Sequence, residues 1–116
     1  MKFIRRRSQV YILIRTVIET LETAKQMMDE QDVIILDVRE QDEYDSGHII
    51  DAVLLPVGTI DEDRAAAVIP EKDSIVLVYC RSGNRSKTAS AALVELGYTQ
   101  VYEFGGINDW PYEIEE

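Results

Sequence analysis

Two continuous apolar runs, at residues 32–38 (DVIILDV) and 74–80 (SIVLVYC), constrain the fold of this chain more than any other feature. Neither run alternates apolar with polar residues, and the first is rich in β-branched residues and bounded by charge. Such runs are typical of strands that are covered on both faces. Helical patterns separate the runs along the chain, so the sequence predicts an α/β domain with a parallel sheet and helices on both faces.

Weaker patterns complete the predicted order of elements. Thr20 is the expected N-cap of a first helix, and Thr59 with Glu62 matches a capping box before a third helix. We expect the remaining strands at residues 10–14, 48–56 and 100–104, and helices at residues 20–29, 40–46, 59–68 and 87–97.

The charge is distributed unevenly along the 116 residues, whose net charge is -10. Residues 1–18 carry five basic residues and no acid, which leaves 7 basic against 22 acidic residues in 19–116. We interpret residues 1–18 as a basic leader with a possible first strand, and residues 19–116 as one domain. The apolar run at residues 10–14 is too short for a signal peptide or a membrane span. The acidic body argues against nucleic-acid binding, and no membrane partner is expected.

The chain has a single cysteine, Cys80. One cysteine cannot form an internal disulfide, and no cluster of residues has the spacing of metal ligands. We therefore expect a reduced, cytoplasmic protein without a zinc or iron-sulfur site.

Cys80 ends the most strand-like run, and the loop RSGNRS at residues 81–86 leads from it into a helix. At this edge of a parallel sheet, backbone amides and the positive end of a helix form a cradle for an anion. Ionising a thiol whose ordinary pKa is about 8.5 at neutral pH requires ~2.7 kcal/mol. A helix terminus and nearby guanidinium groups supply that amount. Most lone cysteines are inert packing residues, but this combination of neighbours favours a nucleophile.

Three ordered motifs make the chain resemble a single-domain rhodanese, a sulfurtransferase-type domain, over about residues 19–112. They are ILDVREQDEYDSGHI at residues 35–49, VYCRSGNRS at 78–86 and GGINDW at 105–110. The resemblance implies a five-stranded, mainly parallel α/β fold. It also implies that Cys80 takes a sulfane sulfur from thiosulfate or a similar donor as a persulfide and passes it to cyanide or a thiol, without a cofactor.

The loop residues receive separate roles under this hypothesis. Arg81 is best placed to meet the sulfonate of the donor. The side chain of Arg85 either faces the anion or turns back to pair with an acid, and both orientations stay open. Ser86 is expected to cap the helix in preference to touching substrate. The amides of the expected cradle belong to Arg81, Ser82, Gly83, Asn84, Arg85 and Ser86.

Four further residues are expected near the site with structural roles. Asp37 and Arg39 end a strand at the same sheet edge as Cys80, where charge-assisted hydrogen bonds commonly hold loops. His48 is the only histidine and invites a Cys-His dyad, but in the motif that it matches the histidine is structural. Trp110 is expected to cover the edge of the sheet near the pocket.

Two alternatives remain beside the thiosulfate sulfurtransferase. One is a non-catalytic or relay module that carries persulfide sulfur between protein partners. The other, less favoured, is a cysteine phosphatase or arsenate reductase, whose loop resembles Cys-x5-Arg, whereas this chain has Cys-x4-Arg. The expected partners are a small anionic sulfur donor and a thiophilic acceptor, with a sulfur-relay protein as a further candidate. We expect a monomer or a weak homodimer.

Overall fold

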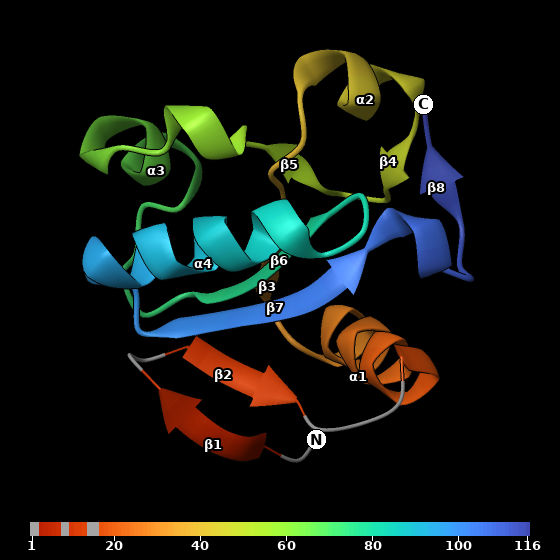
Figure 1. Cartoon of the computed structure of the whole chain (residues 1–116), viewed down its shortest axis with the longest axis horizontal. Helices are drawn as coiled ribbons and strands as arrows, with labels where there is room; N and C mark the ends of the chain where they lie inside the picture. The colour runs from red at the N-terminus through yellow and green to blue at the C-terminus, as the bar shows by residue number, and fades with distance from the viewer. Residues whose placement is uncertain (1–2, 8–9, 14–16) are drawn as a thin grey trace.

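The computed structural model describes the backbone of residues 3–7, 10–13 and 17–116, and the side chains of residues 20–116. Parts of the predicted leader, residues 1–2, 8–9 and 14–16, lie outside the described residues. The main sheet of the described chain has six strands in the order β1–β2–β7–β6–β3–β5 (Figure 1). These strands are β1 (Phe3–Arg7), β2 (Val10–Leu13), β3 (Val33–Asp37), β5 (Val53–Leu54), β6 (Ile75–Cys80) and β7 (Gln100–Gly106).

The pairing of the strands confirms the predicted α/β class and the mainly parallel sheet. Strands β2, β7, β6, β3 and β5 run parallel to their neighbours, and β1 pairs antiparallel with β2 at the edge. Within the described residues the sheet therefore has one strand more than the predicted five. The extra strand is β1, which lies in the stretch interpreted as a leader.

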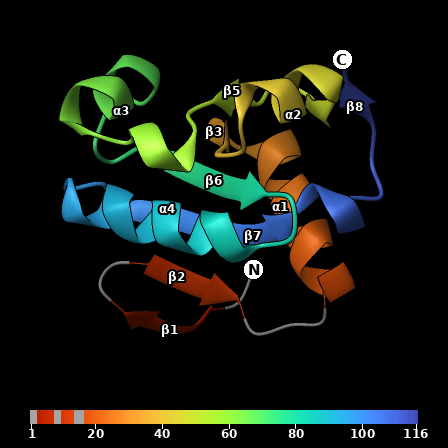
Figure 2. The ribbon, with the colours of Figure 1, turned by 45° about the horizontal axis from the view of Figure 1, so that its top comes forward.

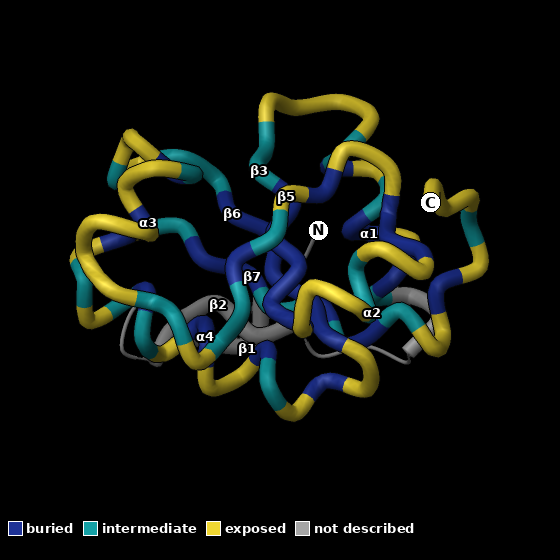
Figure 3. The backbone as a smooth tube through the Cα atoms, turned by 90° about the horizontal axis from the view of Figure 1, so that it is seen from above, coloured by how far each residue is buried: buried dark blue, intermediate teal, exposed yellow. Residues whose placement is uncertain are grey.

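Helices cover both faces of the sheet, as the sequence predicts (Figure 2). Helix α1 (Val17–Glu30) packs on one face through Leu21 and Met27. Helices α3 (Glu62–Val68) and α4 (Asn84–Glu95) pack on the other face, where Leu93 is fully buried. Figure 3 shows that the buried backbone runs through the central strands, with exposed segments around them.

Strand β6 lies in the middle of the sheet, between β7 and β3. Its residues Val76–Cys80 are all buried, because side chains that alternate along the strand enter the two cores in turn. Val78 and Cys80 point into the core under α3 and α4, whereas Leu77 and Tyr79 point into the core under α1. Cys80 therefore reaches the carboxyl edge of the sheet on the α4 side.

The single strand predicted at residues 48–56 is wrong. The structure has two short strands there, β4 (His48–Ile49) and β5, and they belong to different sheets. Asp51, in the left-handed region with φ +69°, forms a turn between them that a continuous strand does not allow. β4 pairs antiparallel with β8 (Ile114–Glu115), which is far from it along the sequence.

Both predicted N-caps are also wrong. Thr20 lies inside α1, which begins at Val17. Thr59 lies in the short 3₁₀ turn η1 (Val57–Thr59), where its hydroxyl donates to the carbonyl of Pro56. Asp61 caps α3 instead, because its carboxylate accepts from the backbone N–H of Arg64.

Helix α2 (Gln41–Ser46) and the 3₁₀ turn η2 (Ile107–Asp109) both contact residues 81–86, which follow β6. The polar helix predicted at residues 40–46 is confirmed, and Glu40 and Glu43 form its capping box. In the part of the chain that the structure describes, no helix has the length and apolar character needed to cross a bilayer.

Candidate active site

Cys80 is the last residue of β6. A short loop leads from the end of β6 into α4 (Figure 2). The thiol is free and buried, with the residue only 1% exposed. The loop turns at Gly83, which is the N-cap of α4 and has φ +110°, a conformation that favours glycine. Arg81 and Ser82 are exposed, so the sulfur lies just below the surface of the molecule.

Backbone amides of the loop face the sulfur. The N–H of Gly83 donates to Cys80 Sγ at 3.0 Å. Burial raises the pKa of the Cys80 thiol, but hydrogen bonds from the Ser86 hydroxyl and from the N–H groups of Ser86, Gly83 and Ser82 outweigh it. The net pKa of Cys80 therefore lies below its ordinary value. This arrangement stabilises negative charge on sulfur, as a nucleophilic cysteine requires.

The closing motif GGINDW packs against the same loop and fixes its position. Gly106 pairs with Cys80 across β7 and β6, and a Cβ atom at Gly106 would lie 2.1 Å from the carbonyl oxygen of Arg81. That oxygen also accepts from the N–H of Asn108 at 3.1 Å. The absence of a side chain at Gly106 therefore allows β7 to support the loop beside Cys80.

Arg85 turns away from the cradle and pairs with an acid, so the structure decides between the two orientations left open by the sequence. Its two terminal nitrogens donate to the two carboxylate oxygens of Glu43, at 2.7 and 3.0 Å. The Arg85 guanidinium holds the pKa of Glu43 down at about 2. The same pairing raises the pKa of Arg85. This ion pair ties α4 to α2 beside the loop.

Ser86 does not cap α4, contrary to the prediction. Gly83 occupies the N-cap position, and Ser86 is the third residue of the helix. The fully buried Ser86 hydroxyl lies 2.7 Å from Glu103 Oε1, 3.0 Å from the carbonyl oxygen of Gly83 and 3.5 Å from Cys80 Sγ. Ser86 therefore links Cys80 to a carboxylate on β7.

Asp37 and Arg39 form a buried ion pair in the α1-side core. Arg39 Nη2 lies 2.7 Å from Asp37 Oδ2 and also donates to the carbonyl oxygen of Gly47 at 2.7 Å. The Tyr79 hydroxyl donates to the same carboxylate at 2.7 Å and accepts from the N–H of Ile49. Burial and the Asp37 hydrogen bond raise the pKa of Tyr79 far above its ordinary value. These contacts hold the segment after β3.

His48 and Trp110 form their contacts with groups other than Cys80 Sγ. The two ring nitrogens of His48 lie 2.9 Å from the carbonyl oxygen of Tyr44 and 3.2 Å from the carboxylate of Glu115, and its ring stacks on Tyr44. Trp110 packs edge-on against Tyr112 with ring centroids 4.9 Å apart, in the core under α1. Both residues therefore lie in contacts that support the fold around the site.

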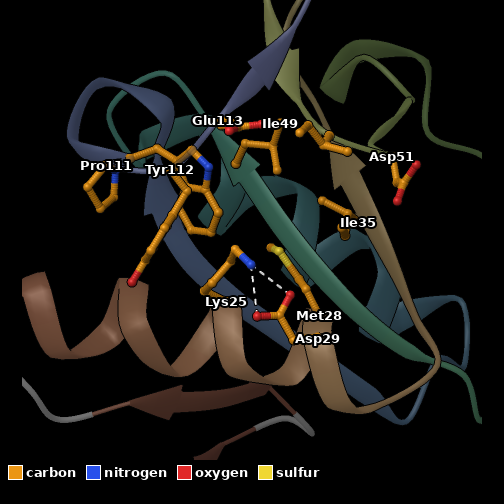
Figure 4. A pocket seen from close by; sticks show the side chains of 11 residues that line it. Lys25, Met28, Asp29, Ile35, Ile49, Asp51, Pro111, Tyr112 and Glu113 are labelled. Carbon is orange, nitrogen blue, oxygen red and sulfur yellow. Dashed lines mark hydrogen bonds and ion pairs between the residues drawn. The ribbon is translucent and has the colours of Figure 1, made fainter.

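A cavity of about 490 Å³ opens on the α1 side of the sheet (Figure 4). Lys25 and Asp29 of α1 form an ion pair in its lining, and Pro111 and Tyr112 lie beside them, with Lys25 Nζ 5.5 Å from the centroid of the Tyr112 ring. Cys80 faces the other core. The cavity is therefore separate from the sulfur and its amides.

Sequence reasoning missed Glu43 and Glu103. Glu43 gave no signal, because it lies in a polar helix and only the fold brings it to Arg85. Glu103 had a weak signal, since it is a carboxylate in the middle of an otherwise apolar strand. A charged residue in such a place needs a polar partner, and here the partners are Ser86 and the N–H of Gly105.

Comparisons with known proteins give a consistent result. A family profile described as rhodanese-like domain matches residues 20–112. Thiosulfate sulfurtransferase GlpE of Coxiella burnetii is 36% identical over 88 residues, which cover 75% of this chain and 79% of GlpE. Thiosulfate sulfurtransferase PspE of Escherichia coli is 38% identical over 74 residues, or 64% of this chain and 70% of PspE. A solved structure described as rhodanese with anions from E. coli is 32% identical with a TM-score of 0.68, covering 73% of this chain and 99% of that one.

Proposed function

The chain belongs to the family of rhodanese-like domains, and from this premise we propose that it is a sulfurtransferase whose Cys80 carries one sulfur atom as a persulfide. The observation that carries the proposal is the hydrogen bond from the Gly83 amide to Cys80 Sγ, at the end of the central strand β6. The similarity to GlpE and PspE, both named thiosulfate sulfurtransferases, supports thiosulfate as the donor.

In the proposed first step, the Cys80 thiolate attacks the outer sulfur of thiosulfate. A bond forms between the two sulfurs, and the bond between the outer sulfur and the sulfonate breaks. Its electron pair leaves with sulfite, which departs as a dianion, and the outer sulfur of the persulfide keeps the negative charge that it carried in thiosulfate. The amides that face Cys80 Sγ stabilise negative charge before and after the transfer.

In the proposed second step, a thiophilic acceptor such as cyanide or a thiolate attacks the outer sulfur of the persulfide. The bond between the two sulfurs breaks, and its electron pair returns to Cys80 Sγ as thiolate. The loop amides again receive the charge, so the enzyme is restored without a cofactor. Because Cys80 is only 1% exposed, the exposed residues Arg81 and Ser82 must move aside to admit the donor.

The orientation of Arg85 supports sulfur transfer over phosphate chemistry. Both ends of its guanidinium group are bound to Glu43, and the pair is only partly exposed. A phosphatase loop needs such a group to contact the phosphate oxygens. Here the loop presents backbone amides, and Arg81 is its exposed cation. These groups suit a donor that presents only its outer sulfur to the thiolate.

The proposal is tested by intact-protein mass spectrometry after incubation with thiosulfate. We expect one added sulfur atom on Cys80, release of one sulfite, and loss of the added sulfur with formation of thiocyanate when cyanide follows. Cys80→Ser is the control and should take up no sulfur. Unmodified protein and no sulfite would contradict the proposal.

The same assay separates the enzyme from the relay module. An enzyme turns over thiosulfate and cyanide repeatedly without another protein. A relay module reacts slowly with thiosulfate but acquires one sulfur on Cys80 from a persulfidated protein donor. Repeated turnover by the isolated chain therefore supports the enzyme, whereas loading only from a protein donor supports the relay.

A further inference from the structure

Glu103 is a carboxylate in the central part of β7, within reach of the proposed nucleophile through one side chain. Its Oε1 atom lies 2.7 Å from Ser86 Oγ, and Ser86 Oγ lies 3.5 Å from Cys80 Sγ. From this chain of contacts we infer that Cys80 and Glu103 share one proton across the Ser86 hydroxyl. This inference deepens the proposed function and rests on it. Glu103 is then the group that becomes protonated, through Ser86, when Cys80 becomes a thiolate.

The Ser86 hydroxyl has a single proton to donate. Three acceptors surround it: Glu103 Oε1 at 2.7 Å, the carbonyl oxygen of Gly83 at 3.0 Å and the carbonyl oxygen of Gly105 at 3.5 Å. Cys80 Sγ, also 3.5 Å away, donates to the hydroxyl. The shortest contact, to a carboxylate, takes that proton while Glu103 is ionised, because hydrogen bonds to charged acceptors are shorter and stronger. The oxygen of Ser86 is then free to accept the S–H proton of Cys80.

The two hydrogen bonds reverse together when the protons move. In one state the thiol donates to Ser86 and Ser86 donates to the Glu103 carboxylate. In the other state the neutral Glu103 carboxyl donates to Ser86, and Ser86 donates to the Cys80 thiolate. One proton leaves sulfur, one passes from Ser86 to Glu103, and the total charge of the three groups is unchanged. The thiolate therefore forms without a charge entering or leaving the buried site.

The surroundings of Glu103 keep both states accessible. Burial raises the pKa of Glu103, while hydrogen bonds from Ser86 and from the Gly105 N–H, together with the charge of Lys87 on α4, oppose that rise. Burial also raises the pKa of Cys80, but hydrogen bonds from the Ser86 hydroxyl and from loop amides outweigh it, and the sulfur interacts with the charge of Arg85 on α4. The pKa of the Glu103 carboxyl is thus raised and the pKa of the Cys80 thiol is lowered. This combination allows the two groups to share one proton.

The test is an ultraviolet titration of the thiolate, recorded as the difference from Cys80→Ser so that the tyrosines cancel. This measurement needs no sulfur donor and no access of a reagent to the buried thiol. In the unmodified chain we expect two steps separated by more than about one pH unit, the sign of two interacting groups. In Glu103→Gln, which keeps the shape and the acceptor oxygen but takes no proton, we expect one step. Glu95→Gln removes an exposed carboxylate from the far end of α4 and should keep both steps.

Ser86→Ala removes the bridge, and we expect the two steps to merge because the thiol and the carboxyl lose their common partner. A single step in the unmodified chain would overturn the inference. Two steps that persist in Glu103→Gln would overturn it as well, since another group would then hold the proton, and so would a separation unchanged in Ser86→Ala. Failure of Cys80 to take up sulfur from thiosulfate would count against the proposed function alone, because the titration is read without a donor.

Discussion

Arg85 and Glu43 are 42 residues apart in the chain, yet both guanidinium nitrogens at the end of Arg85 bind the Glu43 carboxylate. This two-point contact joins the first turn of α4 to α2, next to the loop that surrounds Cys80. One of the two arginines of the loop therefore braces it instead of facing the anion. The negative charge of the proposed persulfide is left to the backbone amides and to Arg81.

The brace can be removed with Glu43→Gln. We expect the free energy of unfolding at pH 7 to fall by about 1–2 kcal/mol, because a two-point ion pair that is only partly exposed is worth more than an ordinary surface pair. Urea unfolding measures the change. Glu113→Gln, which removes an exposed carboxylate, is the control and should have almost no effect. Equal stability of the two variants would contradict the assigned role of Glu43.

The same pair makes a prediction about acid. The pKa of Glu43 is lowered from 4.5 to about 2 in the folded chain, so its contribution to stability is complete above pH ~5 and is lost as the pH falls towards 2. The stability difference between the unmodified chain and Glu43→Gln should therefore shrink between pH ~5 and pH ~2. Urea unfolding across this range measures it, and a difference that stays constant would show that the pair does not titrate as described.

The sequence predicts the central part of the fold because its signals are local. β3 and β6 are continuous apolar runs, and each lies within one residue of its predicted bounds. β4 has no such signal, since its two residues become a strand only by pairing with β8 near residue 115. Short strands of this kind are produced by tertiary contacts, which local patterns do not contain.

The candidate site divides in the same way. The position of Cys80 at the carboxyl end of a central strand can be predicted from chain order. The turn at Gly83 can be predicted because glycine permits the backbone conformation found there. The contacts of Arg85 and Ser86 cannot be predicted in this way, because their partners Glu43 and Glu103 come from other elements. A capping role for Ser86 was a reasonable prediction for a serine near a helix start, but Gly83 already occupies that position.

The buried pair of Asp37 and Arg39 predicts a large loss of stability. Asp37→Ala leaves the Arg39 guanidinium, which is 5% exposed, without its charge partner, and such losses cost about 3–5 kcal/mol. Tyr79→Phe removes one hydroxyl from the same carboxylate and should cost about 1–2 kcal/mol. Urea unfolding compares them, and a smaller loss for Asp37→Ala than for Tyr79→Phe would contradict this account.

Gly106 predicts a link between loop position and thiol chemistry. In Gly106→Ala the new Cβ would meet the carbonyl oxygen of Arg81 at 2.1 Å, so the loop must move away from Cys80. We expect the free energy of unfolding to fall by about 1–3 kcal/mol, and the pKa of Cys80 to rise as the amides move away. Gly58→Ala is the matched control, because nothing lies within 4 Å of its Cβ. An unchanged thiolate absorbance in Gly106→Ala would show that the loop keeps its amides in place without this close approach.

Arg81 is the exposed cation of the loop, and under the proposed function it binds the sulfonate of the donor. Arg81→Ala should raise the KM for thiosulfate by about fivefold to tenfold, equivalent to ~1–1.4 kcal/mol of lost charge-assisted binding at an exposed position. The kcat should change little, because the amides that stabilise the thiolate belong to the backbone. Arg64→Ala removes an exposed arginine from α3 and controls for the change in net charge. Equal rises of KM in the two variants would mean that the donor responds to overall charge, and Arg81 would then have no specific contact with it.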